Sequence, residues 1–150
     1  MADWRTLTTA DVLTALNGTE LTAIKARLGA ADGSAEDQLP DIITHVVAEC
    51  RGYISAWSAN TLAEGETLPT ALIHHAVVIV RYRLMTRLGL SVNEARTTEY
   101  NDAYAYLRDI AKGLVKLPPG SAADDTERAA PSPSLTARER TWQSSSQDGI

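Results

Sequence analysis

The residues in this sequence with the clearest potential for chemistry are two adjacent histidines, His74 and His75. Imidazole is a common metal ligand, but neighbours on a helix point about 100° apart, whereas two ligands of one ion need a spacing of three or four residues. His45 would have to lie across from His74 to complete a metal site. Histidines in a core or an interface, hydrogen-bonded to a backbone or side-chain group, are the simpler interpretation. We therefore expect no metal ion and no cofactor.

The single cysteine, Cys50, is the other candidate for reactivity. Its position on the apolar face of a predicted helix favours a small buried hydrophobic residue over a nucleophile. The sequence also lacks a Gly-rich phosphate loop, a Gly-x-Ser-x-Gly elbow and a pair of carboxylates in an apolar setting. We therefore expect that the protein is not an enzyme.

Three arginines, Arg81, Arg83 and Arg87, form the most suggestive group of charges, and the last two lie one helical turn apart. One interpretation is a solvated face whose ion pairs each contribute little. The other is a contact with another subunit, because arginine beside Tyr82 is a combination favoured at protein interfaces. The pattern leaves both interpretations open. For a subunit contact, we predict that these arginines pair with carboxylates of a neighbour, such as those at 64–66.

These arginines belong to residues 68–90, the segment around which the chain is organised. Pro69 suits the first turn of a helix and Gly89 suits its end. The apolar run at 77–80 would also fit a buried strand, but the length of the segment and its freedom from internal Gly or Pro favour a helix. The apolar run is too short to cross a membrane, which needs about 20 residues. The residues that we predict in the core are Ile73, Val77, Val80, Leu84, Tyr104 and Leu107.

The predicted fold class is all-α. Three long helices over about 40–58, 69–88 and 92–112 form a bundle with two short N-terminal helices over about 9–16 and 19–28. Capping side chains mark the predicted helix starts, at Thr8 or Thr9, at Thr19, and at Ser91 with Glu94 in a capping box. Residues that stop a helix mark the predicted ends, at Asn17 with Gly18, at Gly29 and at Gly113. We expect a loop at 30–38 and an exposed loop at 60–68.

Composition indicates one domain with a real core, because the 150 residues are 44% hydrophobic and 22% charged. The net charge of −5 argues against non-specific affinity for nucleic-acid phosphates, which depends on clustered Lys and Arg. The N-terminus lacks the apolar stretch of a signal peptide, so we expect maturation in a reducing cytoplasm.

The chain divides into a helical domain at 1–116 and a polar tail at 117–150. The tail is rich in Pro, Ser, Ala and Asp, so we predict that it is disordered alone and ordered in an assembly. An isolated Trp142 in such a tail is either incidental or an anchor for a partner. We predict that Trp142, with Arg138 and Arg140, contacts that partner.

Short motifs in the helical part resemble a known family. They are Pro-Thr-Ala-Leu at 69–72, Val-Arg-Tyr-Arg-Leu at 80–84 and Tyr-Ala-Tyr-Leu-Arg-Asp-Ile-Ala-Lys-Gly at 104–113, preceded by the segment 46–54. In this order, they are similar to the small helical head-completion proteins of tailed bacteriophages, especially those of Mu-like phages and prophages. The resemblance covers about 11–117.

This resemblance implies a structural virion protein, an adaptor in the head–tail connector. Such proteins form a homo-oligomeric ring in the neck, typically of twelve copies. The ring joins the portal of the head to the tail or to a stopper or tail-completion protein, and it surrounds the channel through which DNA leaves. The expected location is therefore the virion neck, assembled in the cytoplasm of the bacterial host, with no membrane.

Acidic residues facing such a channel would repel phosphates and let DNA pass without sequence readout. The alternative function is a small helical DNA-binding or regulatory protein, with an enzyme subunit as a more remote possibility. A basic recognition helix would distinguish the alternative, and the basic stripe here is confined to the three arginines.

Overall fold

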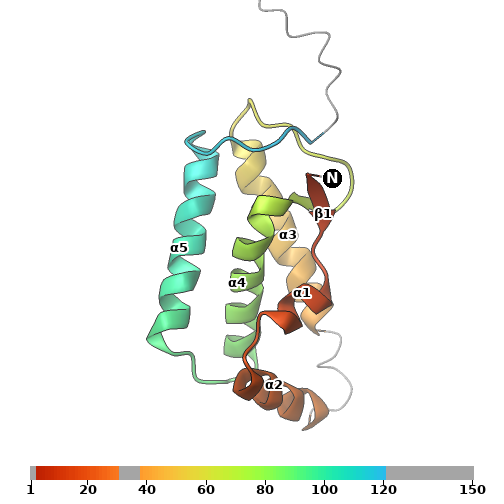
Figure 1. Cartoon of the computed structure of the whole chain (residues 1–150), viewed down its shortest axis with the longest axis vertical. Helices are drawn as coiled ribbons and strands as arrows, with labels where there is room; N and C mark the ends of the chain where they lie inside the picture. Colours follow the sequence, from red (N-terminus) through yellow and green to blue (C-terminus); the bar gives the residue numbers. More distant parts are fainter. Residues whose placement is uncertain (1–2, 31–37, 121–150) are drawn as a thin grey trace, which may run out of the picture.

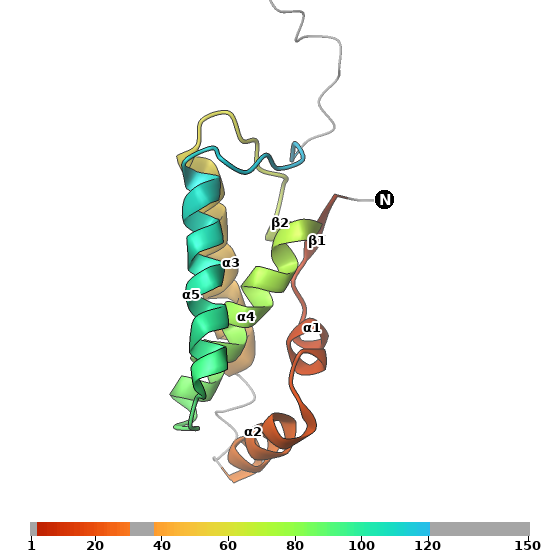
Figure 2. The same ribbon diagram turned by 60° about the vertical axis from the view of Figure 1, so that its left-hand side comes forward.

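The computed structural model describes residues 3–30 and 38–120, and it confirms the helical class. The elements in chain order are β1 (Trp4–Thr6), α1 (Thr9–Thr14), α2 (Gly18–Ala30), α3 (Gln38–Ala56), β2 (Thr67–Pro69), α4 (Thr70–Arg87) and α5 (Glu94–Ala111). The three long helices contact one another as a bundle, with β1 and α1 along one side of it and α2 at its lower end (Figure 1). In the turned view of Figure 2, α2 lies at the end of the bundle where α4 ends and α5 begins.

Helix α4 is the central element because it buries most of its apolar side chains and packs against α1, α3 and α5. The structure buries five of the six predicted core residues, Ile73, Val77, Val80, Leu84 and Leu107. Tyr104 is half-buried instead, since its hydroxyl reaches polar partners. None of the helices within the described residues is long and apolar enough to cross a membrane.

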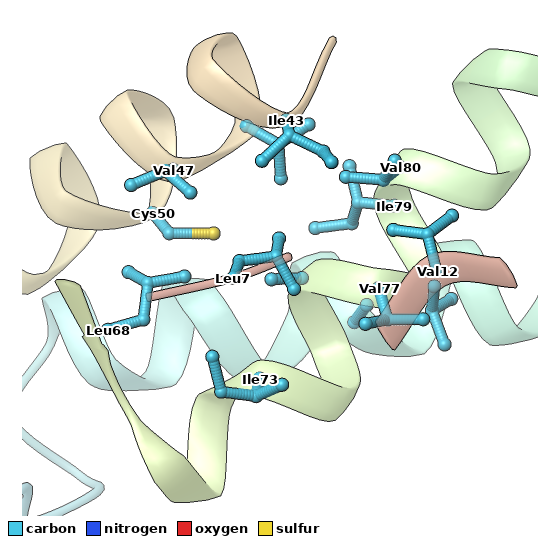
Figure 3. Packing of buried hydrophobic residues seen from close by; sticks show 14 of the residues in the cluster. Leu7, Val12, Ile43, Val47, Cys50, Leu68, Ile73, Val77, Ile79 and Val80 are labelled. Carbon is cyan, nitrogen blue, oxygen red and sulfur yellow. The ribbon is translucent and has the colours of Figure 1, made fainter. Parts of the chain in front are cut away.

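The N-terminal segment completes the core. Figure 3 shows Leu7 and Val12 from this segment beside Ile43 and Cys50 of α3 and Val80 of α4. All of these side chains are buried. The short N-terminal elements are therefore part of the same hydrophobic core as the bundle.

A two-stranded sheet that the sequence analysis did not predict joins the N-terminus to the start of α4. Strands β1 and β2 pair antiparallel, with Trp4 opposite Pro69 and Thr6 opposite Thr67. The prediction of an exposed loop over 60–68 is wrong at its end, because Leu68 is fully buried. Each strand has three residues, too few for an alternating pattern to be recognised.

Helix α1 is capped by Thr8, one of the two predicted caps, and Asp11 completes a capping box that was not predicted. The Oγ1 atom of Thr8 accepts a hydrogen bond from the Asp11 amide at 3.3 Å, and the Asp11 carboxylate accepts one from the Thr8 amide at 2.9 Å. The start predicted for the second helix is wrong. Asn17 caps α2 in place of Thr19, because its side chain accepts from the Glu20 amide at 2.8 Å while Glu20 accepts from the Asn17 amide.

The capping box predicted at Ser91 and Glu94 is also wrong. Asn93 caps α5, because its side chain accepts a hydrogen bond from the Arg96 amide at 2.9 Å. Asn ranks at least as high as Ser as an N-cap residue. Helix α5 consequently begins at Glu94.

The ends of the helices follow the glycines in two of the four predicted cases. Gly18 is instead the first residue of α2, and α1 already ends at Thr14. Helix α4 ends before Gly89 and α5 ends before Gly113, and both glycines have positive φ. Beyond α5, the amide of Leu114 donates to the Asp109 carbonyl at 2.9 Å, which is the predicted Schellman ending. Helix α2 instead continues through Gly29 to Ala30, so the predicted stop there is wrong.

The first residues of the predicted tail pack against the folded body. The indole Nε1 of Trp4 donates to the Pro118 carbonyl at 3.1 Å, and the Gly120 amide donates to the Thr61 carbonyl at 3.0 Å. The folded body therefore extends beyond the predicted boundary at residue 116, at least to Gly120. The predicted contact residues Arg138, Arg140 and Trp142 lie outside the described residues.

Candidate interaction surface

Arg81, one of the three arginines singled out in the sequence, is held inside the chain. Its side chain is 7% exposed, and it forms an ion pair with Glu99 of α5. Its Nη1 atom donates to the carbonyl of Ala15, just past α1, at 3.0 Å. Burial lowers the pKa of Arg81, but a guanidinium keeps its proton in proteins. Arg81 thus ties three helices together.

Arg96 extends this contact into a chain of charges. It donates to both carboxylate oxygens of Glu20, at 2.8 Å and 3.0 Å, and to Glu99 at 3.0 Å. Burial raises the pKa of Glu20, but the hydrogen bonds from Arg96 and the Asn17 amide, together with the positive charges of Arg96 and Arg81, hold that pKa below its usual value. The resulting network, Arg81, Glu99, Arg96 and Glu20, attaches α2 to the bundle.

Arg83 lies between all three long helices. Its Nη2 atom donates to Glu49 of α3 at 2.5 Å and to the Tyr104 hydroxyl of α5 at 2.6 Å. That hydroxyl donates in turn to Glu49 at 2.8 Å. Burial and the hydrogen bond to Glu49 both raise the pKa of Tyr104. Arg83 is one-third exposed, so its partners within the chain do not remove it from the surface.

Arg87 differs from the other two. It is exposed and has no ion-pair partner within residues 3–30 and 38–120. It lines a cleft of about 320 Å³ together with Tyr82, Arg83 and Thr86 of α4 and Tyr100 of α5. We call this group the tyrosine cleft.

The wall of the tyrosine cleft is a row of stacked aromatic rings. Tyr82 and Tyr100 stack with centroids 4.1 Å apart, and Tyr100 meets Tyr104 edge-on at 4.9 Å. Half-buried tyrosines around an arginine are the composition typical of binding hot spots. The cleft therefore combines partly exposed aromatic rings with a guanidinium that has no ion-pair partner in the described residues.

The structure thus separates the three arginines that the sequence analysis grouped. The interpretation as a solvated face does not describe Arg81, which is buried, and a subunit contact through Arg81 or Arg83 stays a prediction. The analysis missed Tyr100 and the partners Glu49 and Glu99. The spacing of Tyr100 and Tyr104, one helical turn apart, was a signal for an aromatic row.

The histidines and the cysteine form no catalytic or metal arrangement in the described part of the chain. His75 stacks on Tyr106, with ring centroids 4.2 Å apart, while His74 and His45 are exposed. No group of three metal-ligating side chains is close enough to hold an ion there. Cys50 is buried, and burial raises the pKa of its thiol to about 12, so the thiol stays protonated at neutral pH.

Fold and surface together define a small helical protein whose helices are joined by ion pairs and whose surface carries an exposed aromatic cleft. Residues 7–134 match the family model described as Bacteriophage Mu, Gp36. The chain therefore belongs to this family, which marks it as a Mu-like phage protein of the structural or assembly class. No curated protein and no solved structure matches the chain significantly.

Proposed function

We propose that this protein is the adaptor of the head–tail connector, a ring of copies in the virion neck between the portal and the tail or stopper. The match of residues 7–134 to the Mu Gp36 family is the observation that supports this function most. The tyrosine cleft adds a surface suited to contact another protein. The protein acts without catalysis in this role, by joining its partners.

Charge in the described part of the chain gives no support to the alternative of a DNA-binding protein. Acidic and basic side chains are equal in number over residues 3–30 and 38–120. Arg81, Arg83 and Arg96 are paired with carboxylates, so they offer little free positive charge to phosphates. The surplus of acidic residues lies at 31–37 and 121–150, so an acidic channel lining would have to come from these segments or from how the copies are oriented.

The test is a phage that lacks this protein. We expect DNA-filled heads and free tails to accumulate separately, and we expect the purified protein to join them when added to the extract. A Leu84→Asp variant, which cannot bury its carboxylate in the core, is the control and should not join them. Particles that assemble normally without the protein, or a defect in head formation itself, would contradict the adaptor function.

The tail is the proposed contact with the portal or a neighbouring subunit. Hydrogen bonds at Pro118 and Gly120 fix its starting point at one end of the bundle. From there, residues 121–150 could span on the order of 100 Å if fully extended. Arg138, Arg140 and Trp142 would provide the contact. A chain ending at Gly120 should keep the melting temperature of the full chain but fail to join heads to tails, and normal joining would refute this role.

A further inference from the structure

The loop between α3 and β2 presents two free carboxylates on a short turn. Glu64 and Glu66 are exposed, and neither side chain has a partner in the described part of the chain. Gly65 between them has a φ of 71°, a conformation that favours glycine. The Oγ1 atom of Thr67 donates to the Glu64 carbonyl at 3.1 Å and closes the turn. We call residues 64–66 the acidic turn.

Hydrogen bonds from Arg51 hold the backbone of the acidic turn in place. The guanidinium of Arg51 on α3 donates to the carbonyls of Ala63 and Thr67, both at 2.8 Å. These two carbonyls lie on either side of the turn, so one arginine fixes both of its ends. A loop that is ordered before binding loses less entropy when it binds, which is an advantage for a recognition element.

The tyrosine cleft has the complementary charge, at the opposite end of the molecule. Arg87 is the last residue of α4, whereas the acidic turn precedes β2, which leads into the first turn of α4. The 18 residues of α4 rise about 27 Å, so the acidic turn cannot reach the cleft of its own chain. In Figure 1, the loop with the acidic turn lies above the bundle, and α4 ends near its lower end.

We propose that the acidic turn of one copy docks in the tyrosine cleft of the next copy. This inference rests on the proposed function, because it names the contact between copies in the ring. A carboxylate of Glu64 or Glu66 pairs with the guanidinium of Arg87, in the geometry that favours two parallel hydrogen bonds. Gly65 has no side chain, so the turn approaches the rings of the cleft closely.

Such a contact is head-to-tail, since each copy offers a turn at one end and a cleft at the other. Repeated head-to-tail contacts close into a ring when the rotation between copies allows it. Each copy therefore makes the contact twice, once with each neighbour.

A charge exchange between copies tests the contact in the phage that encodes the chain. Arg87→Glu alone should place like charges together in every contact, and so should Glu64→Lys with Glu66→Lys. We expect each variant alone to lower the titre of infectious particles about 100-fold or more, because the repulsion between like charges occurs at every contact in the ring. The two variants expressed together should restore the titre to within about tenfold, because alternating copies pair opposite charges everywhere.

Two control variants separate this effect from a general change of charge. Lys25→Glu on α2 and Asp102→Lys on α5 change exposed side chains outside the cleft and the turn. Both should leave the titre near that of the wild type. A mixture that stays as defective as its single variants, with the protein present in the particles, would overturn the inference and leave the adaptor function intact. Full titre in a phage lacking the protein would overturn the adaptor function itself.

A cross-link gives a second readout that does not depend on titre. Particles carrying Glu66→Cys and Thr86→Cys in one chain should yield a ladder of linked copies beyond the dimer after mild oxidation. A chain with Glu66→Cys and Asp102→Cys is the control and should yield no ladder. Cys50 does not interfere, because it is buried. A protein that is present in the particles but forms no ladder, or that links to a different protein, would contradict the contact between copies.

Discussion

Arg81 and Arg87 lie on the same helix, six residues apart, and the fold uses them in opposite ways. Arg81 is buried, with partners from α1 and α5 that belong to its own chain. Arg87 is exposed in a cleft lined by tyrosines, and no carboxylate among the described residues pairs with it. A charge that is already paired inside the chain stabilises the monomer, whereas an unpaired charge beside aromatic rings is available to a partner.

The largest loss of stability is expected at Leu84, which lies between these two arginines on α4. Leu84 is fully buried in the core, so Leu84→Ala should lower the free energy of unfolding by about 2–5 kcal/mol. Leu114→Ala is the matched control, because Leu114 is 72% exposed and its truncation should cost less than about 0.5 kcal/mol. Urea denaturation followed by circular dichroism measures both. A loss below about 1 kcal/mol for Leu84→Ala would mean that this packing is wrong.

The second largest effect is expected at Arg81. Arg81→Ala leaves the Ala15 carbonyl without its donor and Glu99 without its cation, so we expect a loss of about 2–4 kcal/mol. The loss stays below that for a fully buried pair because Glu99 is 44% exposed and regains water. The same denaturation experiment on Arg87→Ala provides the comparison. Equal losses at the two positions would break the distinction between paired and unpaired arginines.

A smaller effect is expected at Asp11, and it depends on pH. Hydrogen bonds from Arg5 and then Thr8 hold the pKa of Asp11 well below its ordinary value of 3.8. The folded state therefore resists protonation of this carboxylate more than the unfolded state does, so its stabilisation is complete above about pH 5 and is lost as the pH falls below about 4.

The measurement is the difference in unfolding free energy between the wild type and Asp11→Asn. We expect about 1 kcal/mol at pH 7, because the variant loses the charge that accepts hydrogen bonds from Arg5 and Thr8, and a smaller difference at pH 2.5. Glu66→Gln removes an unpaired carboxylate and should change stability by less than about 0.5 kcal/mol at either pH. A difference for Asp11→Asn that stays constant with pH would show that its carboxylate does not stabilise the fold in this way.

The smallest effect on stability is expected at Arg87. Arg87→Ala should change the free energy of unfolding by less than about 0.5 kcal/mol, because no described partner is lost. The same variant should nevertheless impair the joining of heads to tails, which the extract assay measures. If Arg87→Ala is clearly destabilised, Arg87 stabilises the fold as Arg81 does. If Arg87→Ala joins heads to tails normally, Arg87 has no role in the contact between copies.

The helices and most of the core could be predicted from the order of the residues alone. The spacing of apolar residues predicted α3, α4 and α5, because a helix that buries one face repeats that face every three to four residues. The helix cap at Thr8 and the helix end at Gly113 could also be recognised, because a cap or a Schellman ending involves residues close together in the chain. The tail boundary was set too early because composition alone does not reveal contacts such as that between Trp4 and Pro118.

The partners of the charged side chains could not be predicted without the packed fold. Arg83 pairs with a carboxylate 34 residues away, and Arg96 with one 76 residues away. No local pattern records such a pairing, because it depends on how the helices pack. The same holds for the pairing of β1 with β2 and for the cleft where Tyr82 meets Tyr100. The sequence placed three arginines on one helix, and packing separated the two that hold the fold together from the one that it leaves free.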